Sequence, residues 1–392
     1  MTTSPPGFSH WHPRRAGVQV NIAGNLPVLV VWGAFVLAFV FGAVANRTNF
    51  CTMGAISDVV NMGHWGRVRM WLLAIAVAMI GANLLSYFGL VDLSRSVYQR
   101  PSLTWLSLLV GGVAFGVGMV LAAGCANKNL VRLGNGSVRS LVVLVFMAIA
   151  AYMTLKGLFG QWRASYLDPV AIDLKPMGLS DQSLPAFLAH YTGMPTKQAV
   201  LAVPAVIGLG LLAFVFRDKR FRGNAVQIVG AVVLGLVIVA GWYLSGHLGY
   251  GENPDTLETV YFATNSHTVE SLSFVGPTAY SLELLMLWTD QSLHITFGIA
   301  SVIGVVLGSF AYAVATRKFR WEGFASLADL RNQLVGALLM GFGGVTALGC
   351  TIGQGLSGLS TLALGSFIAV AGIVGGAAVA LKLVAWNENR TG

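Results

Sequence analysis

The chain has 392 residues, of which 55% are hydrophobic and only 10% are charged, and its formal net charge is +9. Soluble proteins carry about 25% charged residues, so this composition excludes an ordinary soluble protein and places the chain in a lipid bilayer. In a soluble chain the excess of Lys and Arg would suggest nucleic-acid binding, but in a membrane protein it is typical of cytoplasmic loops. We therefore expect no nucleic-acid partner.

Several apolar runs are long enough to cross a hydrocarbon layer of about 30 Å. In chain order, nine membrane-crossing helices are predicted at 26–45, 69–91, 105–124, 137–157, 198–216, 225–245, 293–315, 330–348 and 360–384. Shorter apolar segments cannot span, and four are predicted to be re-entrant helices, at 49–60, 125–133, 277–288 and 350–358. The predicted fold class is an all-α polytopic membrane protein with about nine transmembrane helices and four short re-entrant helices.

A Gly-rich run ends in Gly-Cys in each half of the chain. Residues 109–125 read LVGGVAFGVGMVLAAGC, residues 334–350 read LVGALLMGFGGVTALGC, and nine of the seventeen aligned positions are identical. Such self-similarity indicates a duplicated architecture. Five crossings separate corresponding helices, and because five is odd, the second copy is predicted to be an inverted repeat, as in many secondary transporters. In these transporters the substrate site lies near the midplane, where short segments of both halves meet.

The repeat defines the predicted domain organisation. It comprises an N-terminal external tail (1–25), a first membrane repeat (26–157), an external insertion (158–197), a linking transmembrane helix (198–216), a second membrane repeat (225–384) with an external loop (246–292), and a cytoplasmic tail (385–392). The external side carries eight of the 24 Lys and Arg residues and the other side sixteen. By the positive-inside rule the N-terminus is predicted outside and the C-terminus in the cytoplasm. The 158–197 insertion is either a plain connector or a lid over the entrance.

Three cysteines lie at the junctions of these segments, Cys51, Cys125 and Cys350. A neutral thiol is a weak donor and a soft, polarizable group. It can therefore bind a sulfur-bearing anion briefly without trapping it, as conduction requires. Backbone N–H groups at the starts of short helices would offset the anion's loss of water. Close backbone approach at these breaks is permitted by four glycines, Gly124, Gly349, Gly353 and Gly355.

Arg47 and Lys128 would attract an anion from the cytoplasmic side. Both are equally consistent with a membrane-interface position, where basic side chains extend to water. A lone membrane cysteine is often a small buried hydrophobe, which applies to Cys51 more than to the two cysteines in the repeat. Small residues repeated along a helix are more often packing positions than functional sites, and we interpret four glycines in this way, Gly111, Gly118, Gly336 and Gly343.

No metal site, cofactor or catalytic residue is predicted. The seven histidines form no H-x-x-x-H pair and have no carboxylate at metal-ligand spacing. The predicted spans contain almost no Asp or Glu, which argues against a proton-coupled carrier with a buried carboxylate. Glu283 and Asp290, beside the external re-entrant segment, are the exceptions.

Three motifs resemble the YeeE/YedE family of prokaryotic sulfur-compound transporters, RTNFC (47–51), FGVGMVLAAGCA (115–126) and LMGFGGVTALGCTIGQGL (339–356). The resemblance implies an inner-membrane protein that passes thiosulfate by transient hydrogen bonds to the three cysteines, with Cys125 and Cys350 the more critical. It also implies a small soluble sulfur-carrier partner of the TusA/SirA type on the cytoplasmic side. Two positions depart from the family pattern: Lys128 stands where a glycine is common, and Asn49 where an arginine is frequent.

The sequence therefore predicts an importer of thiosulfate, or of a closely related sulfur or selenium anion, with a narrow cysteine-lined pathway. Two alternatives remain open. A membrane sulfurtransferase or thiol redox enzyme would form a cysteine persulfide, which requires positive charge near the thiol, and Lys128 lies close to Cys125 in sequence. A membrane scaffold for a soluble sulfur carrier would bind its partner without transporting an anion.

Overall fold

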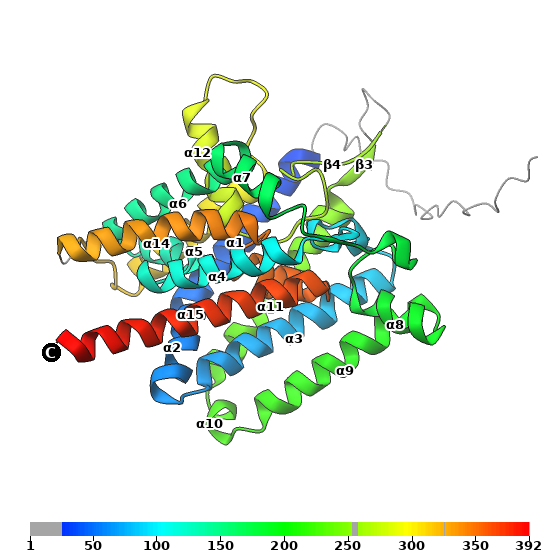
Figure 1. The fold of residues 1–392 in the computed structure, drawn as a ribbon, viewed down its shortest axis with the longest axis horizontal. Helices are drawn as coiled ribbons and strands as arrows, with labels where there is room; N and C mark the ends of the chain where they lie inside the picture. Colours follow the sequence, from blue (N-terminus) through cyan, green and yellow to red (C-terminus); the bar gives the residue numbers. More distant parts are fainter. Residues whose placement is uncertain (1–25, 253–257, 325, 392) are drawn as a thin grey trace, which may run out of the picture.

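The computed structural model describes residues 26–252, 258–324 and 326–391, and the predicted tail 1–25 lies outside these ranges. The described chain is mostly helical (Figure 1). The long helices are α1 (Leu26–Thr48), α3 (Gly66–Tyr87), α4 (Trp105–Leu121), α6 (Val138–Lys156), α9 (Thr196–Phe216), α11 (Ala225–Tyr243), α13 (Phe297–Ala315), α14 (Leu327–Thr346) and α15 (Leu364–Thr391). The last of these runs through the segment predicted as a C-terminal tail.

All nine runs predicted to cross the membrane are helices, but only eight spans in the described chain meet the length and hydropathy that crossing requires. The exception is α14, predicted at 330–348. Its first two turns contain Asp329, Arg331 and Gln333, which shorten the apolar stretch. Within this polar end only Gln333 is buried, and its side chain donates a hydrogen bond to Asp329 at 2.7 Å, whereas Arg331 is exposed.

The four short segments are also helical. They are α2 (Thr52–Met62), α5 (Ala126–Gly134), α12 (Val275–Met286) and the π-helix η5 (Gly353–Gly358). None is long enough to cross the hydrocarbon layer as a single helix. They connect to the ends of longer helices, and two of them, α2 and α5, directly follow α1 and α4.

The 158–197 insertion folds into small elements at one end of the helix bundle. These are α7 (Leu158–Tyr166), β2 (Ile172–Asp173), η3 (Lys175–Met177) and α8 (Leu184–Thr192). Strand β2 pairs antiparallel with β1 (Ser102–Leu103), so the insertion is tied to the segment before α4. We call this end the insertion face. Helix α9 runs from it to α10 (Lys219–Arg222) at the opposite end, which we call the basic-loop face (Figure 1).

The second predicted external loop, 246–292, also contains regular structure. It holds part of the π-helix η4 (Leu244–Leu248), the antiparallel strands β3 (Tyr250–Glu252) and β4 (Thr259–Tyr261), and α12. Residues 253–257 of this loop lie outside the described ranges.

Helices α4 and α14 cross so closely that glycine is required at the contact. A Cβ atom on Gly111 would lie 2.5 Å from the Ala347 nitrogen, and one on Gly343 would lie 2.5 Å from the Gly111 oxygen. The helices are equally close about two turns further along α4, where a Cβ atom on Gly118 would lie 2.7 Å from the Gly336 oxygen. The obstructing atoms belong to the backbone and cannot rotate away. The prediction that these glycines are packing positions is confirmed.

Glu283 of α12 joins this short helix to α6. Its carboxylate is buried and accepts hydrogen bonds from Lys156 at 2.6 Å and from Tyr152 at 3.0 Å. Removing one partner of a buried ion pair leaves an uncompensated charge. Since about half of the Lys156 side chain is exposed, water lowers that cost, and we expect Lys156→Met to reduce the free energy of unfolding by about 2 kcal/mol.

Thermal unfolding of the detergent-purified protein would measure this loss. Lys175→Met, which removes an exposed lysine of the same face, serves as the control, and Lys156→Met with Glu283→Gln should recover most of the lost stability. An unchanged melting temperature for Lys156→Met would show that the pair does not hold α12 in place.

Candidate anion pathway

Each of the three cysteines lies between a tight turn and a short helix: Cys51 and Cys125 are the N-caps of α2 and α5, and Cys350 lies three residues before the start of η5. The residue two positions before each cysteine has a positive φ although it is not glycine: 53° at Asn49, 52° at Ala123 and 57° at Leu348. The amide of the residue that follows bonds to a carbonyl five residues earlier, at 3.0, 2.9 and 2.8 Å respectively. This pattern ends the preceding long helix in the manner of a Schellman turn. The same local structure therefore occurs three times.

The cysteine sulfurs lie where the helix starts supply backbone donors. Cys51 Sγ accepts a hydrogen bond from the Gly54 amide at 3.4 Å, and Cys350 Sγ accepts one from the Gly353 amide at 3.5 Å. Cys125 is the N-cap of α5, as Cys51 is of α2, and the backbone of Lys128 lies next to the Cys125 sulfur. Unpaired amides and the helix dipole make such positions favourable for negative charge.

Tertiary packing brings these helix starts together inside the protein. The Cys51 and Cys125 thiols are close enough to interact directly, and Cys125 also lies beside Thr351, the residue after Cys350. Cys125 and Cys350 are fully buried, and Cys51 is 5% exposed. Cys125 is thus the central member of the group, with Cys51 on one side and the Cys350 segment on the other.

Polar atoms without partners surround the cysteine group. Asn127 is 1% exposed, and neither its amide nitrogen nor its amide oxygen has a hydrogen-bond partner. The buried hydroxyl oxygens of Thr52 and Thr351 likewise lack a nitrogen or oxygen partner. Buried polar groups are nearly always hydrogen-bonded, so this concentration of unused donors and acceptors suits a path for a polar species.

A polar contact among three helices holds α5 in place. The Asn46 amide of α1 donates to Asn135 at 2.6 Å and to the Ser309 hydroxyl of α13 at 3.0 Å. Ser309 in turn donates to the Val131 carbonyl of α5 at 2.7 Å. These bonds fix the short helix that carries Cys125 against the helix that leads to Cys51.

Basic side chains gather beside Cys51 and Cys125. The ammonium of Lys128 donates a hydrogen bond to the Asn49 side chain and lies near both thiols, Arg67 and Arg132. Arg132 also donates to the Ala123 carbonyl at 2.7 Å. We call Arg67, Lys128 and Arg132 the basic cluster.

Lys128, predicted from sequence, is therefore next to the cysteines. Arg47, the second predicted basic residue, is exposed at the end of α1 and lines a small cavity with residues of α11. Arg67 and Arg132 were missed from the sequence. Arg132 follows Lys128 by one helical turn, a spacing that places both side chains on one helix face and could have revealed it.

The four predicted pathway glycines occupy the turns and helix starts around Cys125 and Cys350. A Cβ atom on Gly124 would lie 3.1 Å from the Lys128 side chain, and one on Gly349 would lie 3.1 Å from the backbone nitrogen of Gln354. A Cβ on Gly353 would lie 2.6 Å from the Ser273 hydroxyl, and one on Gly355 would lie 2.8 Å from the Trp71 ring. Side chains at any of these positions would fill space beside the cysteine-bearing segments.

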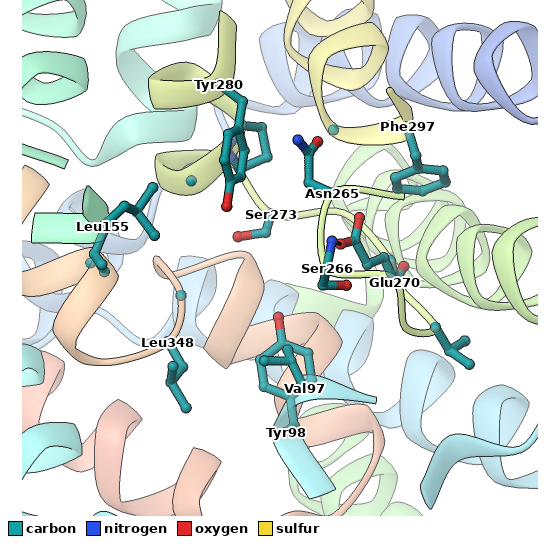
Figure 2. Close-up of a pocket in the computed structure, with 18 of the residues that line it drawn as sticks. Val97, Tyr98, Leu155, Asn265, Ser266, Glu270, Ser273, Tyr280, Phe297 and Leu348 are labelled. Atoms are coloured by element: carbon teal, nitrogen blue, oxygen red, sulfur yellow. Dashed lines mark hydrogen bonds between the residues drawn. The ribbon is translucent and has the colours of Figure 1, made fainter. Parts of the chain in front are cut away.

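A cavity of about 330 Å³, the outer cavity, leads from the insertion face to the Cys350 segment. Figure 2 shows Tyr98 and Tyr280 directed into it from opposite sides, with Ser273 between them and Leu348 at its lower edge. Its lining reaches Gly349, the neighbour of Cys350. The cysteine group thus lies between a cavity on one side and the basic cluster on the other.

Comparison with known proteins agrees with this arrangement. The family model described as Sulphur transport matches residues 47–379, which include all three cysteines. The chain belongs to this Sulphur transport family. It is 28% identical over 338 residues to the thiosulfate transporter TsuA of Escherichia coli strain K12, covering 83% of this chain and 87% of that protein. It is 26% identical over 352 residues to the thiosulfate transporter TsuA of Spirochaeta thermophila, covering 87% of this chain and 94% of that protein.

Membership of a transport family, together with eight candidate spans in the described chain, establishes a multi-pass membrane protein. The resemblance to YeeE/YedE transporters is confirmed. The two positions that depart from the family pattern, Asn49 and Lys128, are hydrogen-bonded to each other. They therefore form one local feature beside Cys51 and Cys125 rather than two separate changes.

Proposed function

We propose that this family member imports thiosulfate, or a closely related inorganic sulfur anion, along a path that passes Cys350, Cys125 and Cys51 in turn. The main support is that three cysteines that follow the same kind of helix-ending turn are brought together between a cavity and a basic cluster. The thiosulfate transporters named above share 26% and 28% identity with this chain over most of its length.

The chemistry of such a path follows from its donors. A dianion that leaves water loses a large solvation free energy, and the amides at the helix starts and the unpartnered Asn127 and Thr351 groups can replace part of it. Each thiol adds a weak S–H donor. Because the nearby Lys128 ammonium is already hydrogen-bonded to Asn49 and a thiol is only a weak donor, the anion is held weakly enough to leave.

We also propose that the two halves form the inverted repeat. Gly111 contacts Gly343 and Gly118 contacts Gly336, whereas the sequence repeat aligns Gly111 with Gly336 and Gly118 with Gly343. Reciprocal contacts of this kind are what a pseudo-two-fold axis through the α4–α14 crossing produces. The insertion face would then be external and the basic-loop face cytoplasmic, by the positive-inside rule, and a soluble sulfur carrier would dock on the basic-loop face.

Uptake of labelled thiosulfate by a bacterium lacking its own transporter tests this function. Cells that produce the chain should accumulate the label, and cells that produce the Cys125→Ala, Cys350→Ala double variant at equal membrane abundance should not. Full uptake by the double variant would contradict the cysteine path. Mass spectrometry of the protein after exposure to thiosulfate should show no added sulfur, since hydrogen bonding leaves no covalent product, whereas a persulfide would support the sulfurtransferase alternative.

A further inference from the structure

A second cavity, of about 310 Å³, lies beside the outer cavity. We call it the side cavity. Both cavities are lined by Tyr98, Arg100, Arg163 and Leu348. The arginines come from separate segments, since Arg100 precedes β1 and Arg163 lies on α7 of the insertion. Two guanidinium groups thus meet at the boundary of the two cavities, on the side of the protein where the cysteine path opens toward the insertion face.

Arg163 is held in place through its Nε atom, and its two Nη atoms remain available to bind a ligand. Its Nε atom pairs with Asp168 at 3.1 Å, and the other Asp168 oxygen accepts a hydrogen bond from Ser107 of α4 at 2.6 Å. Among the described residues, the Arg163 Nη atoms and the whole Arg100 side chain have no ion pair. Asp168, the one carboxylate that lines the side cavity, is therefore already bonded to Arg163 and Ser107. The positive charge of Arg100 has no carboxylate partner in this cavity.

The wall of the side cavity contains buried polar atoms without partners. Thr346 and Ser366 are each 1% exposed, and neither hydroxyl has a hydrogen-bond partner. Both residues line the side cavity, as does Gln354. Buried hydroxyls left unpaired are costly, so these two donors point to an acceptor that occupies the cavity.

The outer cavity is less suited to hold an anion. Glu270 lines it, and burial raises the pKa of that carboxyl. Its side chain accepts a hydrogen bond from the Ser266 amide at 2.8 Å. A carboxyl group repels an anion when ionised and offers only one donor when protonated. Both cavities share the two guanidinium groups, but only the side cavity adds the two unpartnered hydroxyls of Thr346 and Ser366.

We propose that the side cavity is a receiving site for a doubly charged tetrahedral oxyanion, which Arg100 and Arg163 bind from the rim and Thr346 and Ser366 from the wall. This inference rests on the proposed function, which makes thiosulfate the ligand. Guanidinium groups present paired N–H donors that match oxyanions of this shape. Thr346 and Gln354 each lie four residues from Cys350 in sequence, so the site adjoins the first cysteine of the path. The insertion then has a role beyond connecting the halves, since it supplies Arg163.

Binding of thiosulfate to the purified full-length protein in detergent, measured by calorimetry, tests the site. Arg100→Gln and Arg163→Lys should each raise Kd about tenfold, the loss expected for a hydrogen bond to a charged group, and the KM of uptake should rise in parallel with the maximal rate retained. Arg163→Lys keeps a cation beside Asp168 and so avoids unfolding the insertion. Arg95→Gln is the matched control, because Arg95 is on the same face but pairs with Asp92 outside both cavities.

Two further variants separate a binding role from a structural one. Thr346→Val with Ser366→Ala should weaken thiosulfate binding several-fold, yet leave the melting temperature of the ligand-free protein unchanged or higher, because neither hydroxyl has a partner to lose. Cys350→Ala should show the opposite kinetic pattern, with Kd retained and transport lost. Unchanged Kd values in the arginine variants of a protein that does transport thiosulfate would overturn this site and leave the proposed function standing. A wild-type protein that neither binds nor transports thiosulfate would overturn both.

Discussion

Replacing Cys125 by alanine is expected to lower the rate of thiosulfate uptake more than replacing Cys51. Cys125 is the central thiol, since its sulfur interacts with Cys51 and lies beside Thr351 of the Cys350 segment. Alanine removes the thiol donor at this point of the path, and a hydrogen bond to a charged group contributes about 1.5–3 kcal/mol. If that loss appears in the transfer step, uptake falls about tenfold to a hundredfold. Cys51 stands at the edge of the group, near Lys128, whose charge remains to receive the anion.

Initial uptake rates of labelled thiosulfate, normalised to protein in the membrane, would measure these effects. Cys125→Ser is the matched variant, because a hydroxyl keeps the donor and a similar volume, and it should retain more uptake than Cys125→Ala. Equal rates for wild type and Cys125→Ala would remove the central thiol from the mechanism. A loss that is the same for serine and alanine would instead show that sulfur chemistry, not donation of a hydrogen bond, is required.

The largest effect on stability is expected from a methyl group at the α4–α14 crossing. In Gly343→Ala the new Cβ atom would lie 2.5 Å from the Gly111 oxygen and from the Phe115 nitrogen. Both are backbone atoms, so the helices must move apart, and overpacking of this kind costs about 3 kcal/mol. Since the helices that separate lead directly to Cys125 and Cys350, uptake should fall together with stability.

Gly375→Ala provides the control for this prediction. Gly375 lies inside α15, and a Cβ atom there would meet nothing within 4 Å. Alanine is the better helix former by about 1 kcal/mol, so this variant should unfold at the same temperature as wild type or a higher one. Thermal unfolding followed by size-exclusion chromatography would compare the two. A Gly343→Ala protein as stable as Gly375→Ala would show that the two helices tolerate a wider separation.

Apolar run length predicted the helices well because lipid leaves the backbone few alternatives. A segment in hydrocarbon must satisfy its own N–H and C=O groups, so an apolar run of sufficient length becomes a helix. All nine predicted runs are helical, and the short segments are helical too. The difference lies in α14, whose first turns contain Asp329, Arg331 and Asn332 and are largely exposed, so the apolar part of this helix is shorter than the helix itself.

The candidate site was only partly accessible to this reasoning. The sequence located Cys51, Cys125 and Cys350 and the nearby Lys128, because each cysteine stands at a junction between apolar runs, two of them in Gly-Cys pairs. It did not identify Arg100 or Arg163 as part of a site; they approach the Cys350 segment from two segments that are far apart along the chain, the stretch before β1 and α7. Nor did it indicate that Asn49 and Lys128 are in contact.

What the sequence by itself determined is the set of local structures: which runs form helices, where those helices break, and that a cysteine stands at three of the breaks. Only the tertiary structure shows which of these helix breaks lie next to each other. The close approach of α4 to α14 requires glycines on both helices at the same contact, and this pairing is not visible along the chain. Hydrogen bonding and helix termination act over a few residues and are therefore readable in order along the chain. The alignment of thiols, arginines and unpaired hydroxyls depends on helices that meet after long separations in sequence, and no local pattern encodes it.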